Sequence, residues 1–133
     1  MKKKDLEYGL IKQEEIKKYI ESFFNVKLKD PKSNFSRYDY KSKGYRFEIK
    51  SRKINSDLYT STLLCKSKIE YYKKIKNKEK TFIIIFNYLD KIKYIQFNDD
   101  LLNLPLKKTY VKRGEFVENI EIPIHLLQDL KCL

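Results

Sequence analysis

The alternation of apolar and polar residues along the chain predicts a helix, three strands and a second helix. Apolar side chains recur three and four positions apart over residues 12–24, which is the pattern of an amphipathic helix that covers a sheet. Apolar and polar residues alternate with the period of a strand over residues 25–30, 35–40 and 45–53. A looser helical stripe over residues 58–76 predicts the second helix.

The second half of the chain is predicted to consist mainly of strands. Residues 81–88 read T-F-I-I-I-F-N-Y, and an apolar run without alternation is typical of a central strand that is covered on both faces. Residues 91–97 begin with alternation and follow after only two residues, so we expect them to form a hairpin with that central strand.

Two further elements are expected toward the end of the sequence. Residues 109–112 and 116–122 are predicted to pair as a hairpin about residues 113–114, which include a glycine. A short helix is predicted over residues 123–130, because a proline suits the first position of a helix. The order of all these elements predicts an α/β fold with a mixed sheet.

The length and charge of the chain indicate a single domain with a polyanionic partner. The 133 residues are enough for one domain over residues 1–133, and 30 Lys and Arg against 18 Asp and Glu give a net charge of +12. Nucleic acid is therefore the expected partner, DNA first with RNA left open, although the lysine richness also fits an AT-rich genome. Because few of the basic residues are Arg, we expect contacts to the sugar–phosphate backbone rather than base-specific ones.

The remaining composition argues against several other classes of protein. Cys65 and Cys132 lack a CxxC partner, so neither a zinc site nor a disulfide framework is expected, and a reducing intracellular compartment fits. His125 is the single histidine, which argues against a two-histidine metal centre and leaves a structural residue near the terminal helix, and three glycines form no phosphate-binding loop. No apolar stretch is long enough for a signal peptide or a membrane span.

The stretch D-Y-K-S-K-G-Y-R-F-E-I-K, residues 39–50, offers candidate chemistry. Asp39 ends one predicted strand, a turn follows at residues 41–44, and the next strand alternates. In that strand Glu48 and Lys50 share one face, because side chains repeat every two residues. If the two strands pair as a hairpin, Asp39 lies across from this face. Two carboxylates and one ammonium group would then converge, which predicts a site for a divalent metal.

The spacing of these residues is not specific by itself. A chain so rich in lysine is expected to contain an Asp with a later acid-x-Lys about twice by chance when about ten spacings are allowed. The acid-x-Lys pattern indeed recurs, for example at residues 15–17 and 129–131. What distinguishes residues 48–50 is their position on an alternating strand, after a strand that ends in an acid and between two predicted helices.

In this arrangement the chain resembles the PD-(D/E)XK nuclease superfamily. The resemblance covers the order of elements over residues 12–88, with Asp39 as the acid of the second strand and E-I-K at residues 48–50 as the motif of the third. In size the chain is similar to small single-domain members from phages and large DNA viruses and to Holliday-junction resolvases. Tyr38 stands where a Pro often precedes the first acid. The resemblance implies a restriction-endonuclease-like core of helix, three strands, helix and strand, here with an extra C-terminal strand region.

The resemblance also implies a function and a set of site residues. It implies an endonuclease in which Asp39, Glu48 and the backbone carbonyl of Ile49 bind Mg²⁺ or Mn²⁺, and Lys50 orients the attacking water or the phosphate. In some members a Glu of the first helix completes the site, and Glu15 is the candidate for this part here, with a solvated helix acid as the alternative. The alternative for Asp39, Glu48 and Lys50 is an ordinary ion pair on an exposed strand face.

Several basic residues are predicted to contact nucleic acid, and one segment is a predicted interface. The basic candidates are Arg46, Arg52, Lys53, Lys66 and Lys73. The lysines of the second helix can equally form a solvated face. The apolar segment at residues 122–127 is a candidate homodimer interface, with core packing as the alternative. The competing function is a nucleic-acid-binding or virion-associated structural protein that keeps a nuclease-like fold without its chemistry.

Overall fold

The first helix packs on one face of the central sheet and is longer than its apolar pattern predicts. The computed structural model describes residues 3–30, 38–112 and 114–132 of the chain. Helix α1 spans Lys3–Phe24, so it begins before residue 12. Its buried residues Ile16 and Ile20 lie on the helical stripe that the sequence predicts. The amphipathic pattern therefore identified the packed half of the helix.

The central sheet is mixed, as predicted. In the described part of the chain it has five strands, in the order β1-β2-β4-β5-β8. Only the β2–β4 pair is parallel, and the other neighbouring pairs are antiparallel. The bounds are β1 Tyr40–Ser42, β2 Tyr45–Ser51, β4 Thr81–Asn87, β5 Lys91–Gln96 and β8 Gln128–Cys132. The general α/β class with a mixed sheet is thus confirmed.

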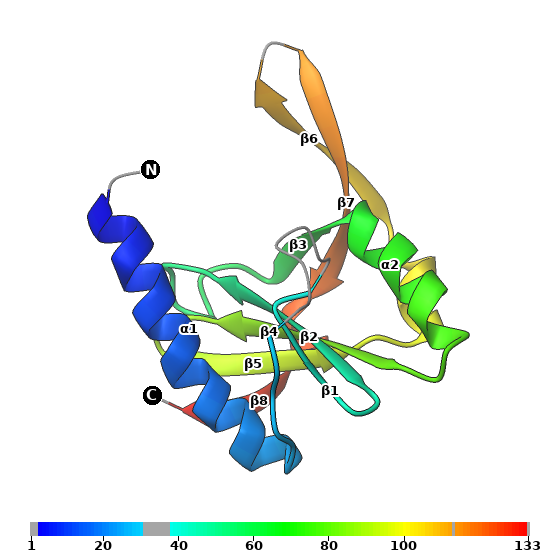
Figure 1. The fold of residues 1–133 in the computed structure, drawn as a ribbon. Helices are drawn as coiled ribbons and strands as arrows, with labels where there is room; N and C mark the ends of the chain where they lie inside the picture. The colour runs from blue at the N-terminus through cyan, green and yellow to red at the C-terminus, as the bar shows by residue number, and fades with distance from the viewer. Residues whose placement is uncertain (1–2, 31–37, 113, 133) are drawn as a thin grey trace.

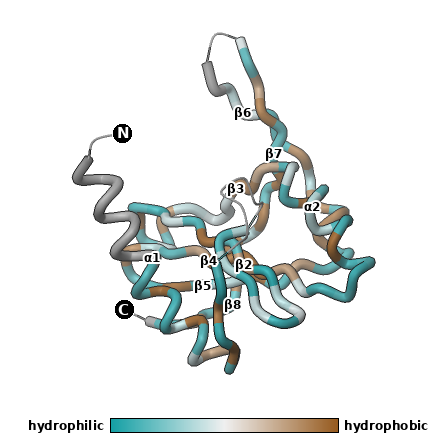
Figure 2. The backbone as a smooth tube through the Cα atoms, in the orientation of Figure 1, coloured by the Kyte–Doolittle hydropathy of each residue, from teal (hydrophilic) through white to brown (hydrophobic). Residues whose placement is uncertain are grey.

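Strand β3 and helix α2 form the crossover between β2 and β4, and β3 belongs to a second sheet. Strand β3 (Ser61–Cys65) leads directly into α2 (Lys66–Lys76). The second sheet has the order β3-β7-β6, with β6 at Leu106–Lys112 and β7 at Glu115–Pro123. The β6–β7 hairpin extends away from the rest of the molecule (Figure 1), and hydrophilic and hydrophobic stretches alternate along β7 (Figure 2).

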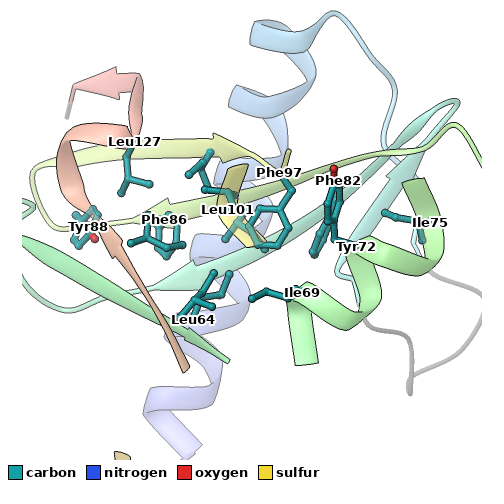
Figure 3. Close-up of a cluster of buried hydrophobic side chains, with 14 residues drawn as sticks. Leu64, Ile69, Tyr72, Ile75, Phe82, Phe86, Tyr88, Phe97, Leu101 and Leu127 are labelled. Carbon is teal, nitrogen blue, oxygen red and sulfur yellow. The ribbon is translucent and has the colours of Figure 1, made fainter. Parts of the chain in front are cut away.

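Two hydrophobic clusters lie on opposite faces of the central sheet, and β4 contributes to both. Ile83 and Ile85 belong to the cluster that includes Ile16 and Ile20 of α1, whereas Phe82, Ile84 and Phe86 belong to the cluster on the α2 face. Figure 3 shows the second cluster, in which side chains of α2, β3 and β4 meet. All five residues from Phe82 to Phe86 are fully buried. The run of apolar residues therefore forms a central strand covered on both faces, as predicted.

The predicted helix over residues 58–76 is wrong in its first half. Residues Ser61–Cys65 form β3, which pairs antiparallel with β7, and the helix begins only at Lys66. Thr62 and Leu64 are buried by this pairing. The apolar residues of this segment have helical spacing. Its conformation is nevertheless set by a partner strand more than fifty positions away.

The predicted helix over residues 123–130 is also wrong. Its first residues form a short 3₁₀ turn, η2 (Ile124–Leu126), which contains His125, and the chain then continues as β8. Strand β8 pairs with the outer edge of β5, which satisfies backbone groups that a helix here would leave unpaired at that edge. Ile122 and Leu127 of the apolar segment are buried in the α2-side core. Core packing, the alternative reading of that segment, accounts for both residues.

The strands predicted before the Gly44 turn are shorter than expected. Residues 25–30 form no strand, and among the described residues a single isolated bridge, between Lys29 and Lys41, links them to the sheet. Residues 31–37 lie outside the described residues, and so does the first half of the strand predicted at 35–40. The C-terminal hairpin is confirmed and is longer than predicted, although Arg113 in its turn lies outside the described residues. A 3₁₀ helix, η1, spans Asp99–Asn103.

Within the described residues, no helix combines the length and the apolar character that a membrane crossing requires.

Candidate metal and nucleic-acid site

The β1–β2 hairpin brings Asp39 to the backbone of the E-I-K motif. Gly44 in its turn has a φ of +84°, a conformation that glycine adopts without the steric cost of a side chain. The N–H of Asp39 donates to the carbonyl of Phe47 at 2.8 Å. The Asp39 carboxylate oxygen Oδ2 accepts the N–H of Ile49 at 2.7 Å. Asp39 therefore lies beside the peptide group that joins Glu48 to Ile49.

Glu48 is buried on the α2 face of the sheet and contacts two lysines. Its residue exposure is 8%, which is low for a charged side chain. The Glu48 oxygen Oε1 lies 3.2 Å from Nζ of Lys50 and 3.1 Å from Nζ of Lys68. Lys50 comes from the same strand, whereas Lys68 comes from the first turn of α2. The cluster therefore joins β2 to the crossover helix.

The two carboxylates influence each other electrostatically. Burial and the negative charge of Glu48 raise the pKa of Asp39, and the N–H of Ile49 with the charges of Lys50 and Lys68 offsets only part of this effect. Two neighbouring acids that are partly removed from water are stabilised by a cation placed between them. Carboxylate oxygens are also the ligands that Mg²⁺ and Mn²⁺ prefer, so this donor set fits such an ion.

The structure does not bring every predicted ligand to this cluster. Helix α1 covers the sheet face opposite Glu48, and Glu15 is an exposed residue of that helix, so its part in a metal site stays a prediction. Among the described residues no group of three or more His, Cys, Asp or Glu side chains is arranged to hold a metal. The acidic side chains that the structure describes at this place are therefore Asp39 and Glu48, and the part of the Ile49 carbonyl as a metal ligand stays a prediction.

Of the predicted nucleic-acid contacts, Arg46 lies on the same strand as Glu48. It precedes Glu48 by two positions on β2, and its guanidinium lies 5.2 Å from the ring centroid of Tyr38. Burial raises the pKa of Tyr71 on α2, while the neighbouring Arg46 charge lowers it in part. Because Tyr38 and Tyr71 also contact each other, with ring centroids 6.1 Å apart, an aromatic pair borders the cluster on the Arg46 side.

The other predicted basic contacts are dispersed over the surface. Arg52 donates to the carbonyl of Leu63 at 3.3 Å and lines a separate cavity of about 450 Å³. Lys66 lies 3.7 Å from a carboxylate oxygen of Glu118 on β7. Lys53 and Lys73 are exposed. That these residues form one binding surface stays a prediction.

Sequence reasoning missed Lys68 as a member of the site. Lys68 was expected only as one of several lysines of a helix that began near residue 58. Because α2 begins at Lys66, Lys68 stands in its first turn and faces the sheet, with a side chain that is 13% exposed. One feature of the sequence points to this position, because Lys68 directly precedes Ile69, the first buried residue of α2.

Cys65, at the end of β3, lies within electrostatic range of two lysines of the cluster. Burial raises the pKa of its thiol, but the hydrogen bonds from Ser67 and the charges of Lys68 and Lys50 outweigh burial and lower it. The Ser67 hydroxyl donates to Sγ of Cys65 at 3.3 Å. Cys65 is a free thiol in this structure.

No protein-family model, no curated protein and no solved structure matches this chain. The geometry of the Asp39–Glu48–Lys50–Lys68 cluster therefore carries the functional interpretation.

Proposed function

We propose that this protein is a metal-dependent nuclease that acts on DNA, with branched or junction DNA as a candidate substrate. The observation that carries the proposal is the juxtaposition of the Asp39 carboxylate with the E-I-K motif, through its 2.7 Å hydrogen bond to Ile49. A cluster of two acids and two lysines contains both kinds of group that phosphodiester cleavage needs, namely anionic metal ligands and cationic phosphate ligands.

The residues of the cluster have distinct parts in this proposal. Asp39, Glu48 and the backbone carbonyl of Ile49 would hold Mg²⁺ or Mn²⁺. A bound divalent ion of this kind acidifies water and neutralises charge on phosphorus oxygens. Lys50 and Lys68, which both lie near Glu48, would turn toward the anionic phosphate when it arrives and orient it in line with the attacking water.

The strand connections support a restriction-endonuclease-like core for the same chain. The bridge at Lys29, then β1, β2 and β4 occur in this spatial order, with antiparallel pairing up to β2 and a parallel β2–β4 pair. This is the order that the resemblance implies for helix, three strands, helix and strand. Two features differ from that expectation, since the first strand is reduced to a bridge and β3 is added before α2.

The charge of the chain and the proposed substrate agree with each other. A net charge of +12 favours encounter with a polyanion and favours contacts to its backbone. A nuclease with this substrate would work inside the cell that holds the DNA, and cutting two strands with one site per chain would require a homodimer. The location inside the cell and the homodimer are both part of the proposed function.

The experiment that tests the proposal measures cleavage directly. Supercoiled, branched and single-stranded DNA, and a matched RNA, are incubated with the protein in Mg²⁺ or Mn²⁺ and in EDTA. Glu48→Ala and Lys50→Ala variants are measured beside the wild type. We expect metal-dependent cleavage by the wild type and its loss in both variants. Equal behaviour of the wild type and the variants would overturn the proposal.

A second function is favoured by one specific observation, the double ion pair of Glu48. Because Glu48 contacts both Lys50 and Lys68, the cluster can also serve as a structural link between β2 and α2 in a protein that binds nucleic acid without cutting it. In the same experiment this function predicts that the wild type and the variants all bind DNA and that none of them cuts it.

A further inference from the structure

A second cationic feature lies beside the candidate site, at the start of β2. It is a cavity of about 590 Å³ between the segment that follows α1, the β1–β2 turn and the residue that precedes β4. None of the described residues that line it is acidic, although the chain as a whole has 18 Asp and Glu. Its cationic lining residues are Lys27, Lys29, Lys41, Lys43, Arg46 and Lys80. We call the cavity with this lining the Arg46 pocket.

The backbone around the Arg46 pocket is held in place by hydrogen bonds. Lys29 and Lys41 exchange two backbone hydrogen bonds, at 2.7 and 2.8 Å, which join the segment after α1 to β1. The N–H of Thr81 donates to the carbonyl of Gly44 at 2.8 Å and joins the turn to β4. Three segments that are distant in sequence are thereby fixed around one cavity, so their cationic side chains start from anchored positions.

Arg46 itself is oriented by the turn. Its Nη1 donates to the carbonyl of Ser42 at 3.2 Å and to that of Tyr45 at 2.7 Å. The Ser42 hydroxyl, which belongs to another residue of the lining, is buried and has no hydrogen-bond partner among the described atoms. A guanidinium held by carbonyls and an unpartnered hydroxyl are groups that can complete the hydrogen-bonding of an anion.

The cationic side chains that line the Arg46 pocket repel one another, and a bound anion relieves that repulsion. A phosphate group suits these partners, because lysines bind it as point charges and an arginine binds it with two parallel hydrogen bonds. The volume is within the range of about 300–1,000 Å³ that is typical of small-ligand sites, so it can admit a nucleotide unit.

We propose that the Arg46 pocket binds a phosphate group of the nucleic-acid strand, next to the phosphate that is cleaved. This inference rests on the proposed function, because it assigns a second contact of the same substrate. Arg46 and Glu48 are two positions apart on β2, and two residues of a strand span about 7 Å. A phosphate at Arg46 therefore belongs to the same strand of substrate as the one at Glu48 and sets which bond is cleaved.

The test compares two double variants that remove the same charge. Lys27→Gln with Lys43→Gln removes two exposed lysines of the pocket, and Lys74→Gln with Lys78→Gln removes two exposed lysines on and just after α2. Binding of a short single-stranded DNA is measured in EDTA by fluorescence anisotropy over a range of salt. We expect the pocket variant to bind about tenfold more weakly, with a salt slope lower by about 1.4, and the α2 variant to change at most about twofold. Equal effects in the two variants would overturn the inference.

The source of the phosphate is decided by the DNA that is used. Linear DNA with a 5′-phosphate, the same DNA with a 5′-hydroxyl, and circular single-stranded DNA are compared. If the pocket variant loses affinity only for 5′-phosphorylated DNA, the pocket holds a terminal phosphate. If it loses affinity for all three, the pocket holds an internal phosphodiester. Either result supports the pocket, whereas unchanged affinity for all three overturns it.

The same measurements separate this inference from the proposed function. If the wild type cuts no substrate while the Lys27 and Lys43 variant still loses affinity in EDTA, the pocket stands and the nuclease proposal fails. If the wild type cuts and the pocket variant binds like the Lys74 and Lys78 variant, the nuclease proposal stands and the pocket fails.

Discussion

The Oε1 oxygen of Glu48 lies between two ammonium groups, at 3.2 Å from Nζ of Lys50 and 3.1 Å from Nζ of Lys68. This relationship joins the E-I-K strand to helix α2 through side chains that are largely removed from water. A buried carboxylate is costly unless charged partners compensate for its lost hydration, and here two partners do so. Any change to one member of this trio therefore acts on stability as well as on the proposed chemistry.

Replacing Lys68 by Ala is expected to destabilise the fold by about 1–2 kcal/mol. The cost is less than for a solitary buried pair, because Lys50 remains beside Glu48. Urea denaturation followed by circular dichroism gives the free energy of unfolding. Lys74→Ala, at an exposed position of the same helix, is the matched control and should change it by less than about 0.5 kcal/mol. A Lys68 variant as stable as this control would contradict a stabilising role for the Lys68–Glu48 ion pair.

Under the proposed function, replacing Glu48 by Gln is expected to reduce the rate of DNA cleavage by about 100- to 1,000-fold or more, because it removes the charge of a proposed metal ligand while it keeps the shape of the side chain. The rate is measured as nicking of supercoiled plasmid in Mg²⁺. Glu118→Gln is the control, since this half-buried acid of β7 pairs with Lys66 at 3.7 Å and lies outside the cluster. Comparable losses in the two variants would mean that acidic residues act only through the overall charge.

Asp39→Asn is expected to raise the melting temperature in EDTA at pH 7. Burial and the Glu48 charge raise the pKa of Asp39 above 3.8, so the folded protein prefers the neutral carboxyl. The stabilising contribution of this group is present below pH 3.8 and is lost as pH rises through the raised pKa. At neutral pH the ionised group therefore costs stability, and Asn removes that cost while it can still accept the N–H of Ile49.

The same variant tests metal binding without any measurement of activity. Mg²⁺ or Mn²⁺ is expected to raise the melting temperature of the wild type, because an ion that binds only the folded state stabilises it by mass action. The shift should be absent in Asp39→Asn. Asp57→Asn, at an exposed acid in the loop before β3, is the control and should keep the full shift. Equal shifts in both variants would argue against Asp39 as a ligand.

Tyr72→Phe is expected to alter stability at high pH. The Tyr72 hydroxyl donates to Oδ1 of Asp99 at 2.9 Å, and burial together with this bond raises the pKa of Tyr72 from 10.0 to about 12. A raised pKa means that the contribution is complete below pH 10 and is lost as pH rises through about 12. The variant should be less stable than the wild type by about 1 kcal/mol at pH 7. The two should converge above pH 10 in urea titrations. A constant difference up to pH 12 would contradict this assignment.

Local pattern was enough to predict the strand that carries the motif. The alternation over residues 45–51 places Phe47 and Ile49 against the α1 side, and it leaves Glu48 toward α2, because strand side chains change face at every residue. The apolar run at Phe82–Phe86 likewise predicted a strand buried on both faces.

Elements whose conformation depends on a distant partner were not predictable in the same way. Residues Ser61–Cys65 carry an apolar pattern that fits a helix, but β7 pairs with them and makes them a strand. Residues Gln128–Cys132 follow a proline that suits a helix start, but the outer edge of β5 binds them. In both cases the backbone hydrogen bonds of a sheet outweighed a weak local preference.

The sequence by itself determined the alternating strand, the Gly44 turn and the approach of Asp39 to the E-I-K motif, because each of these depends on residues within about ten positions of one another. Only the tertiary structure decided that Lys68 joins Glu48 and that six cations surround one cavity. Those contacts require the β3–α2 crossover to return over the sheet and the Lys29–Lys41 bridge to close beside the turn. Their energies come from burial and pairing between segments that are far apart in the chain, and no local pattern encodes such contacts.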